Sequence, residues 1–341
     1  MAVTLTIADE TFQKTWDDAV LSSPHGMIFH TWQWLKLAEI QTSTRLVPIV
    51  VYKGTQLIAL YPVFLQKRGF FTIAFSPPPR AYMLYLGPVI VDYELLKQDK
   101  KESLFIQIQE EIDKYIFEKN ACAISRIRTS PGILDSRPLR WAGYRIEPLY
   151  TYRIPLATGA NSVWENTDRK LRVDINKAIR EGVTVRCGDW EDLEFIQRSL
   201  FNRYLAQGFH PNDYSKYLRM LYESFYPDNL KIFIAEYKGE RAGGIITLCY
   251  NGIMYHWVGV PKSPLTGISP NDLVQWEALK WAVEHGFKSY EIMDSGDVSR
   301  FRQFKAKWNP DLVIWYSATR YSSFVYSWGE RLLRMIQRKS D

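Results

Sequence analysis

The clearest pattern of apolar and polar positions in the chain lies between Gly267 and Asn309. Ser269 is suited to cap a helix there, and Pro270 fits the first helical position, where its missing N–H costs nothing. Gly286 comes after the last turn, where a left-handed residue commonly ends a helix. Four apolar side chains recur at the 3.6-residue spacing of one helical face: Leu273, Trp276, Leu279 and Val283. The pattern predicts one amphipathic helix over residues 270–285.

A strand, a polar turn and a basic helix are predicted directly after this helix. Tyr290 and Ile292 belong to a short buried strand, and residues 294–297 have turn composition. The segment Arg300–Lys307 then holds four cations and two Phe rings in eight residues. Positive charge is therefore concentrated just beyond the end of a buried strand.

The first part of the chain alternates between strand and helix patterns. Residues 76–80 contain three consecutive prolines, which cannot donate to a ladder, so an extended loop is expected there. The predicted elements are a strand at residues 3–8, a helix over Glu10–Leu21, a β-meander from Arg45 to Val91, a long helix over Leu95–Glu118, and strands at Ala121–Arg128 and between residues 141 and 154.

The second part repeats this order after a linker-like stretch at residues 155–159. Asn251-Gly252 between two apolar runs is a strong hairpin signal. The predicted elements are helices over residues 168–180, Trp190–Ala206 and Asn212–Phe225, a three-stranded meander from Leu230 to Val260, the Gly267–Asn309 stretch, a strand at Val313–Tyr321 and an amphipathic helix at Ser323–Lys339. The shared order of helices, meander, long helix and strand suggests two copies of one α/β unit.

Length and composition favour a two-domain protein of a reducing compartment. A chain of 341 residues exceeds the size at which one core keeps growing, so we expect domains at residues 1–155 and 156–341. Cys122, Cys187 and Cys249 are far apart and form no C-x-x-C pair, which argues against a disulfide framework or a zinc site. No signal-peptide pattern and no bilayer-spanning apolar run is present, so a cytoplasmic location is predicted.

The net charge of +6 is concentrated at the C-terminal end. Residues 300–341 carry nine Lys and Arg against three Asp and Glu, so the first 299 residues are electrically balanced. A local basic surface indicates an anionic partner, such as tRNA, a phosphate-bearing acceptor or a membrane. The helix at residues 323–339 combines apolar and basic faces, which suits either peripheral contact with an anionic membrane or docking on its own domain. No oligomeric state is predicted.

Three motifs resemble the Fem-type aminoacyltransferases and the related acetyltransferase-like proteins of the GNAT superfamily. The first runs from P-N at residues 270–271 through W-E-A at 276–278 to the F-x-x-F-K-x-x-W element at residues 301–308. The second is the cationic helix start around Lys170 and Arg172, and the third is the H-T-W-Q-W-L-K stretch that ends at Lys36. The resemblance implies a mixed α+β fold of two tandem GNAT-like domains, each a mostly antiparallel sheet flanked by helices.

The resemblance also implies roles for particular residues in N-acyl transfer. Lys305 would stabilise donor phosphate or the oxyanion, and Phe304 would pack against the donor. Glu291 or Asp294 would accept a proton or orient the amine; the alternatives are a structural ion pair for Glu291 and turn chemistry for Asp294. Further substrate-binding positions are Lys36, Lys170, Arg172, Asn271, Trp276 and Arg302.

The donor and the acceptor stay open at the level of sequence. The chain has no G-x-S-x-G motif, no P-loop and no histidine spacing suited to a metal, so no metal or bound cofactor is expected. The strict glycine loop for acyl-CoA is absent, although Gly267 before the long helix leaves room for a pyrophosphate at its N-terminus. Either acyl-CoA or aminoacyl-tRNA would serve as donor, and an amine on a bulky, phosphate-bearing molecule such as a cell-envelope precursor as acceptor. A non-catalytic module that binds RNA or an anionic membrane is the alternative.

Overall fold

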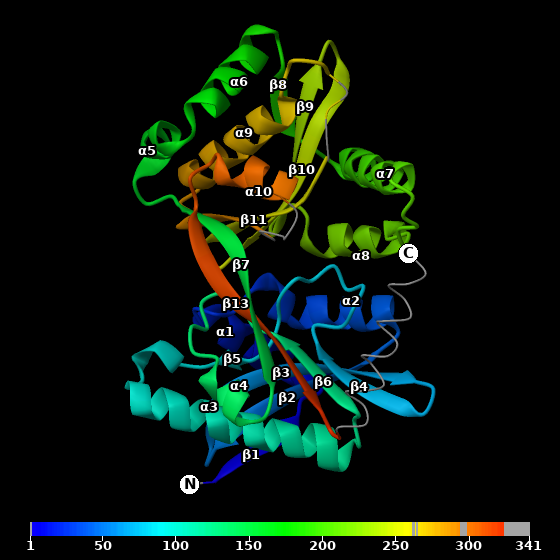
Figure 1. The fold of residues 1–341 in the computed structure, drawn as a ribbon, viewed down its shortest axis with the longest axis vertical. Helices are drawn as coiled ribbons and strands as arrows, with labels where there is room; N and C mark the ends of the chain where they lie inside the picture. The colour runs from blue at the N-terminus through cyan, green and yellow to red at the C-terminus, as the bar shows by residue number, and fades with distance from the viewer. Residues whose placement is uncertain (1, 261–262, 264, 294–298, 324–341) are drawn as a thin grey trace. The chain divides into compact units, whose positions relative to one another are not determined.

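The computed structural model describes residues 2–260, 263, 265–293 and 299–323 of the chain (Figure 1). It has two compact units, which we describe separately. Unit 1 comprises Met1–Leu149 and Ile314–Asp341, and unit 2 comprises Tyr150–Val313. Each is a mostly antiparallel sheet flanked by helices, so the predicted mixed α/β class is confirmed.

The sheet of unit 1 has the strand order β1-β2-β3-β4-β6-β13. Its neighbours are antiparallel except β4 and β6, and β5 pairs with β3. The strands are β1 (Val3–Ile7), β2 (Arg45–Lys53), β3 (Gln56–Arg68), β4 (Phe71–Ser76), β5 (Val89–Ile90), β6 (Ile124–Arg128) and β13 (Asp311–Tyr321). The helices are η1 (Glu10–Phe12), α1 (Gln13–Ser22), η2 (Ile28–His30), α2 (Trp32–Thr42), η3 (Tyr93–Leu95), α3 (Gln98–Asp113), η4 (Lys114–Lys119) and α4 (Arg137–Trp141).

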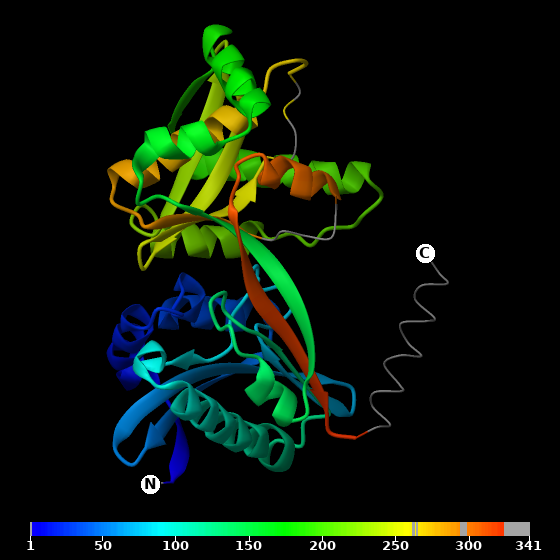
Figure 2. The same cartoon turned by 60° about the vertical axis from the view of Figure 1, so that its left-hand side comes forward.

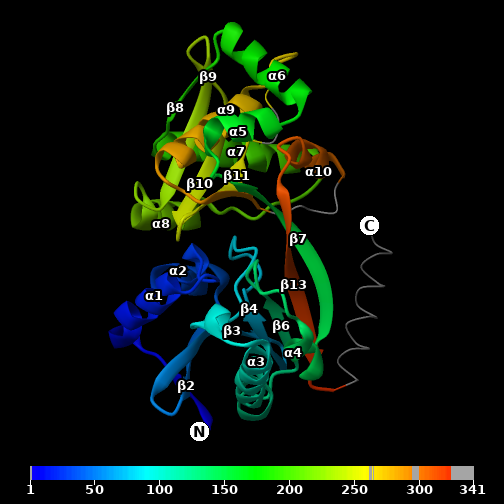
Figure 3. The same ribbon diagram turned by 90° about the vertical axis from the view of Figure 1, so that its left-hand side faces the viewer.

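Helices cover both faces of this sheet, which explains the long apolar runs of its strands. α1 and α2 contact β3 and β2, whereas α3 contributes Phe105, Ile108 and Ile112 to the core against Val47 and Tyr61 (Figures 1 and 3). Six consecutive residues of β2 are buried, because strands covered on both faces lose the polar alternation of a half-exposed strand. The predicted meander and long helix are therefore present, the helix as α3 followed by η4.

The sheet of unit 2 has the order β7-β12-β11-β10-β9-β8, and only its β11–β12 pair is parallel. The strands are β7 (Arg145–Pro155), β8 (Thr184–Cys187), β9 (Leu230–Tyr237), β10 (Glu240–Tyr250), β11 (Ile253–Gly259) and β12 (Ser289–Ile292). The helices are α5 (Gly159–Asn166), α6 (Arg169–Arg180), α7 (Trp190–Ala206), α8 (Ser215–Phe225), α9 (Pro270–Glu284) and α10 (Ser299–Ala306).

The two units repeat one topology, as the shared element order suggested. In each, two helices stand between the edge strand and a three-stranded meander, and a helix then crosses to a parallel strand: α3 leads to β6 and α9 leads to β12. The last strand of each sheet comes from the other part of the chain. β7 follows the elements of unit 1 but pairs with β12, and β13 follows those of unit 2 but pairs with β6.

This exchange changes the division of the chain from the one expected. We expected one boundary at residues 155/156, with everything after it in the second domain. The chain divides within β7, at Leu149/Tyr150, and again within β13, at Val313/Ile314. The second division arises because Ser317 to Tyr321 pair with Arg128 to Ile124 of β6.

Helix α9 is buried on more than the one face expected from the sequence. Its inner side packs on β9 and β10, and α5 and α6 contact its outer side (Figure 2). Val274, Gln275 and Ala278 are consequently buried along with the predicted Leu273, Trp276 and Leu279, whereas Val283 is only partly buried. The prediction of a single buried face was thus too narrow, because α5 and α6 cover the outer side of α9 that was expected to face solvent.

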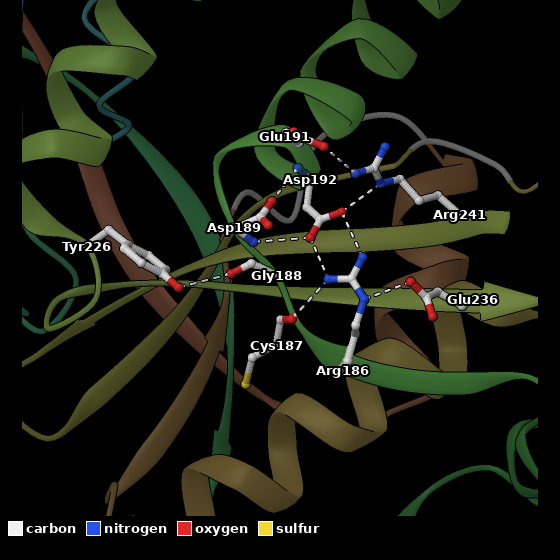
Figure 4. A network of polar contacts seen from close by, with 9 residues as sticks. All are labelled: Arg186, Cys187, Gly188, Asp189, Glu191, Asp192, Tyr226, Glu236 and Arg241. Atoms are coloured by element: carbon white, nitrogen blue, oxygen red, sulfur yellow. Dashed lines mark hydrogen bonds and ion pairs between the residues drawn. The ribbon is translucent and has the colours of Figure 1, made fainter. Parts of the chain in front are cut away.

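A buried carboxylate holds the first turn of α7 against the edge of the unit 2 sheet (Figure 4). Asp192 is fully buried and accepts hydrogen bonds from Arg186 of β8 and Arg241 of β10. Asp189 and Asp192 exchange backbone and side-chain bonds as a capping box. Burial alone would raise the pKa of Asp192, but the hydrogen bonds from Arg186, Asp189 and Arg241 together bring that pKa below its usual value.

The closing strand β7 is fixed in unit 2 by a buried ion pair, and its removal should destabilise the fold. Glu291 of β12 is fully buried and lies opposite Arg153 of β7, whose Nη2 is 2.6 Å from Glu291 Oε2. Arg153→Met would remove this cation from the buried carboxylate. We expect the free energy of unfolding to fall by about 3–5 kcal/mol, measured by urea denaturation.

Arg180→Met on exposed α6 is the matched control for this variant and should change stability little. The double variant Arg153→Met/Glu291→Met should recover most of the loss, because it removes the buried charge as well. A loss below about 1 kcal/mol for Arg153→Met would show that the pair is not what fixes β7.

Candidate functional site

The parallel strands β11 and β12 pair over only four residues of unit 2. Their register runs from Ile253 with Ser289 to His256 with Ile292, where β12 ends. β11 continues to Gly259 and stays paired with β10 on its other edge. The carboxyl ends of parallel strands, outside the ladder, are where ligands bind in open α/β sheets. The end of this short ladder is therefore the first candidate for a functional site.

A β-bulge coincides with the end of this pairing. Thr247 of β10 lies opposite His256, but the preceding Ile246 lies opposite Val258, so β11 carries Trp257 as an extra residue. A bulge bends a strand and increases its twist. The bulge thus falls where the pairing with β12 ends, and beyond it Val260, the residue after β11, is hydrogen-bonded to Asn271 of the helix that follows.

The N-terminus of α9 lies at the same end of the sheet, as the crossover from β11 to β12 requires. Asn271 Nδ2 donates to the carbonyl of Val260, 2.9 Å away, and so joins the first turn of α9 to the end of β11. Ser269 does not cap the helix with its hydroxyl as expected; its Oγ donates instead to Asp272, 2.7 Å away. Asp272 is buried and also accepts from Lys307 Nζ at 2.6 Å.

Two further lysines approach this end of unit 2 from different helices. Lys305 of α10 donates from Nζ to the carbonyl of Met293, the residue after β12, at 2.6 Å. Lys177 of α6 lies beside Gly267 in the loop before α9, since a Cβ on that glycine would be 3.6 Å from Lys177 Nζ. The positive end of the α9 dipole and these amines together favour an anion at this position.

His256 is a neutral imidazole at the point where the ladder ends. Its Nδ1 lies 3.1 Å from Gln275 Oε1 of α9; because a carbonyl oxygen only accepts, Nδ1 carries the proton in this contact. Burial, followed by the charge of Lys305, lowers the pKa of His256 to about 4. The ring is therefore neutral at neutral pH, with its lone pair on Nε2.

Buried amide groups around the α9 start are incompletely hydrogen-bonded. Gln275 Nε2 and Asn271 Oδ1 have no hydrogen-bond partner among the residues that the structure describes. Asn271 Oδ1 also faces Gly243 so closely that a Cβ there would come within 2.5 Å. Unpaired buried polar atoms are costly and are uncommon away from binding sites, so they add to the case for this location.

The structure brings some of the predicted site residues together at this location. Lys305 and Asn271 lie at the end of the β11–β12 ladder, as described above. Phe304 is partly buried on α10, with Lys307 Nζ 4.6 Å from its ring centre, and Arg302 is exposed on the same helix. Asp294 lies outside the described residues.

Glu291 is placed where the structural alternative applies. Its carboxylate is fully buried and accepts from Arg153, and Thr151 Oγ1 lies 3.3 Å from it. It thus holds β7 on β12 from inside the sheet. Its role in proton transfer stays a prediction, and the contacts with Arg153 and Thr151 are explained without that role.

The remaining predicted residues lie elsewhere or have structural contacts. Arg172 donates from Nη1 to the carbonyls of Trp164, Glu165 and Thr167 and so closes the C-terminal end of α5. Trp276 is buried against Trp164, with ring centres 4.7 Å apart. Lys170 is exposed at the start of α6. Lys36 belongs to unit 1, where its Nζ pairs with Glu39 at 3.0 Å.

The fold places three residues here that were not among the predicted site residues: His256, Gln275 and Lys177. His256 stands in the aromatic strand Tyr255-His256-Trp257, a setting typical of a core residue, and its side chain is part-buried. Its contact with Gln275 joins residues 19 positions apart, so no local pattern reveals it. Lys177 belongs to the same cationic helix as Lys170 and Arg172, and the fold brings it beside Gly267.

Residues 165–305 match the family model described as "Acetyltransferase (GNAT) domain". This segment of the chain is a GNAT domain. It lies within unit 2 and contains His256, Asn271, Gln275 and Lys305 of the candidate site. No curated protein sequence matches the chain.

Solved structures show the same fold along nearly the whole chain. FemX matches with a TM-score of 0.71 and 13% identity, over 92% of this chain and 96% of that one. A tandem GNAT protein from the clavulanic acid biosynthesis pathway matches at 0.55 and 11%, over 94% and 99%. L-PGS from Bacillus licheniformis matches at 0.51 and 15%, over 90% and 93%. The tandem GNAT-like, Fem-like fold expected from the motifs is thus confirmed.

No helix within the described ranges is long and apolar enough to cross a membrane. Among the same residues, no three His, Cys, Asp or Glu side chains are grouped closely enough to hold a metal ion. All three cysteines are free, with Cys122 and Cys249 buried and Cys187 exposed.

The buried state of His256 predicts a pH dependence of stability. Its pKa is about 4 in the folded chain against 6.5 when exposed, so unfolding takes up a proton between these values. The free energy of unfolding should fall as the pH drops from about 6.5 to 4, by roughly 3 kcal/mol for this group. Urea denaturation at several pH values measures it.

His256→Gln should remove this part of the pH dependence. His30 of unit 1, whose pKa burial also lowers to about 4, contributes a similar slope that the variant keeps. NMR of histidine-labelled protein provides a direct measurement of each ring. An imidazole of His256 that titrates near pH 6.5 would contradict its neutral, buried state.

Proposed function

We propose that this protein is an N-acyltransferase that moves an acyl or aminoacyl group from an activated donor to an amine of a bulky, phosphate-bearing acceptor. The GNAT domain supports acyl transfer as the class of reaction. The observation that carries the proposal is the end of the β11–β12 ladder, where Lys305, His256 and the N-terminus of α9 converge. The acceptor proposed is a cell-envelope precursor.

The proposed reaction forms one amide bond. The amine nitrogen of the acceptor attacks the acyl carbon, the C–S bond of a thioester or the C–O bond of an aminoacyl ester breaks, and the departing sulfur or oxygen takes up a proton. The amine must lose a proton in the same process. His256 supplies a neutral imidazole for this purpose within the site.

The charges around α9 suit the phosphates of either donor. Acyl-CoA and aminoacyl-tRNA both carry phosphate groups, and a helix N-terminus binds phosphate through its free N–H groups. Lys177 and Lys305 add positive charge at that end of α9. Lys305 would also stabilise the negative charge that develops on the acyl oxygen. The donor pocket proposed here thus lies between the end of β11, the start of α9 and the last turn of α10.

Exposed cations of unit 2 support an anionic acceptor. Lys170 and Arg302 have exposed side chains and are the substrate-binding candidates that point to solvent. The structural neighbours include L-PGS from Bacillus licheniformis and a domain of a putative lysylphosphatidylglycerol synthetase. The name of the second refers to a product in which a lysyl group is joined to a phosphate-bearing lipid, which agrees with a phosphate-bearing acceptor. Peripheral membrane contact through residues 323–339 remains a proposal, since residues 324–341 lie outside the described ranges.

Replacement of Lys305 tests the electrostatic part of the proposal. Lys305→Ala should lower kcat by about 10²–10³-fold, because the loss of one preorganised group that stabilises a developing oxyanion lowers the rate by about that factor. Lys216→Ala, on an exposed position of α8 outside the site, is the matched control and should keep full turnover. Turnover is measured as release of free CoA or of uncharged tRNA. Equal kcat for both variants would exclude Lys305 from the chemistry.

Donor binding distinguishes the two donors and the non-catalytic alternative. Purified protein is titrated with acetyl-CoA and with charged and uncharged tRNA at two salt concentrations. Saturable, salt-tolerant binding of acetyl-CoA would support a small-molecule acyl donor, and preference for charged tRNA would support aminoacyl transfer. Binding of uncharged RNA that falls steeply with salt, without turnover on either donor, would favour the RNA-binding module instead.

A further inference from the structure

The hairpin between β3 and β4 of unit 1 ends in two exposed phenylalanines. Arg68 pairs with Phe71 across the hairpin, so Gly69 and Phe70 form a two-residue turn. Gly69 has φ +60°, a conformation that this tight turn requires and that glycine adopts without strain. The side chain of Phe70 is 103% exposed and that of Phe71 is 46% exposed.

This tip projects beyond the neighbouring strands of its sheet. On one side β2 begins at Arg45, which pairs with Leu65, so the last residues of β3 extend past it. On the other side β6 begins at Ile124, which pairs with Ile73. The end of the hairpin is consequently two-stranded, and Figure 1 shows it at the margin of unit 1 beside the label β4. Phe70 therefore stands at a convex point of the surface.

Positive charge surrounds the tip. Lys67 and Arg68 belong to the hairpin itself and are exposed. Arg45 and Lys119 lie at the same end of the sheet, since Arg45 starts β2 and Lys119 precedes β6. Arg68 and Arg45 bond the neutral side chains of Gln66 and Asn120, so neither charge is cancelled there.

Acidic residues compensate little of this charge. Glu118 adjoins Lys119 at this end of the sheet and is exposed. Glu39 accepts from Lys36 and from the backbone N–H of Leu46, so its charge is already engaged. Two adjacent exposed aromatic rings beside exposed cations are complementary to a partner that is both apolar and anionic.

We infer that the β3–β4 tip docks on the surface of an anionic phospholipid bilayer. Phe70 and Phe71 enter the boundary between headgroups and acyl chains, and Lys67 and Arg68 contact lipid phosphates. A convex, two-residue point suits insertion into a bilayer. Single-stranded nucleic acid is instead bound in grooves or on flat sheet faces where bases stack, which this tip does not provide. The inference is independent of the proposed transfer reaction and of residues 324–341.

Vesicle sedimentation with the full-length protein tests the inference. Phosphatidylglycerol–phosphatidylcholine vesicles are compared with phosphatidylcholine vesicles. Phe70→Ser should weaken binding to the anionic vesicles about tenfold, because burial of one Phe side chain strengthens binding by about that factor. Leu95→Ser is the matched control: Leu95 is 83% exposed in the same unit, away from the tip, and its replacement should leave binding unchanged.

The lysine–arginine pair is tested in the same assay. Lys67→Ser/Arg68→Ser should also weaken binding, mainly at low salt, because lipid-surface attraction is screened within a Debye length. Binding of Phe70→Ser equal to that of the wild type would overturn insertion of the tip. The same holds if Phe70→Ser and Leu95→Ser weaken binding equally.

A fluorescent label at the tip provides an independent measurement. Phe70→Cys in a Cys187→Ser background carries an environment-sensitive dye, since Cys187 is the exposed thiol and Cys122 and Cys249 are buried. Addition of anionic vesicles should shift the emission to the blue as the dye leaves water. A shift with single-stranded RNA but none with vesicles would overturn the lipid assignment in favour of nucleic acid.

Discussion

In both units, the position of the exchanged closing strand depends on an ion pair between an arginine of that strand and a buried carboxylate. In unit 2, Arg153 of β7 pairs with the fully buried Glu291 of β12. In unit 1, Arg320 of β13 pairs with Asp113 of α3, whose pKa burial raises although Tyr144, Gln109 and Arg320 lower it. A buried carboxylate without its cation is strongly unfavourable, so each closing strand can occupy only one place. The sheet edges, and with them the division of the chain, follow from these two contacts.

The candidate site is a consequence of where the second of these sheets stops being regular. β12 lies between β11 and β7 and has four residues, so the parallel ladder is short. The bulge at Trp257 then turns β11 toward α9, and Asn271 joins the two elements. The end of β12 faces Lys305 through the carbonyl of Met293. Irregular backbone, a neutral histidine and lysines thus meet at one end of a rigid sheet, which is an arrangement suited to acyl transfer.

Local patterns in the sequence predicted most elements, and the failures have one cause. The Asn251-Gly252 turn between apolar runs predicted the β10–β11 hairpin, and Gly286 predicted the end of α9 with its positive φ. The predicted single face of α9 was too narrow, because α5 and α6 cover a side that the sequence pattern leaves to solvent. Arg172 was expected at the substrate and instead binds three carbonyls at the end of α5. For α9 and for Arg172 alike, contacts between separate elements decide the environment, and the local sequence pattern does not reveal them.

The sequence by itself determined the mixed α/β class, the repeated order of elements and the motifs that contain Asn271 and Lys305. These follow from periodicity, turn residues and short-range spacing, which act within a few residues. Only the tertiary structure decided that β7 and β13 are exchanged and that Glu291 anchors β7 in unit 2. It also decided that His256 contacts Gln275 and stays neutral beside Lys305. Strand pairing, burial and the pKa values they shift depend on contacts between residues far apart in the chain, and such contacts leave no periodic trace in the sequence.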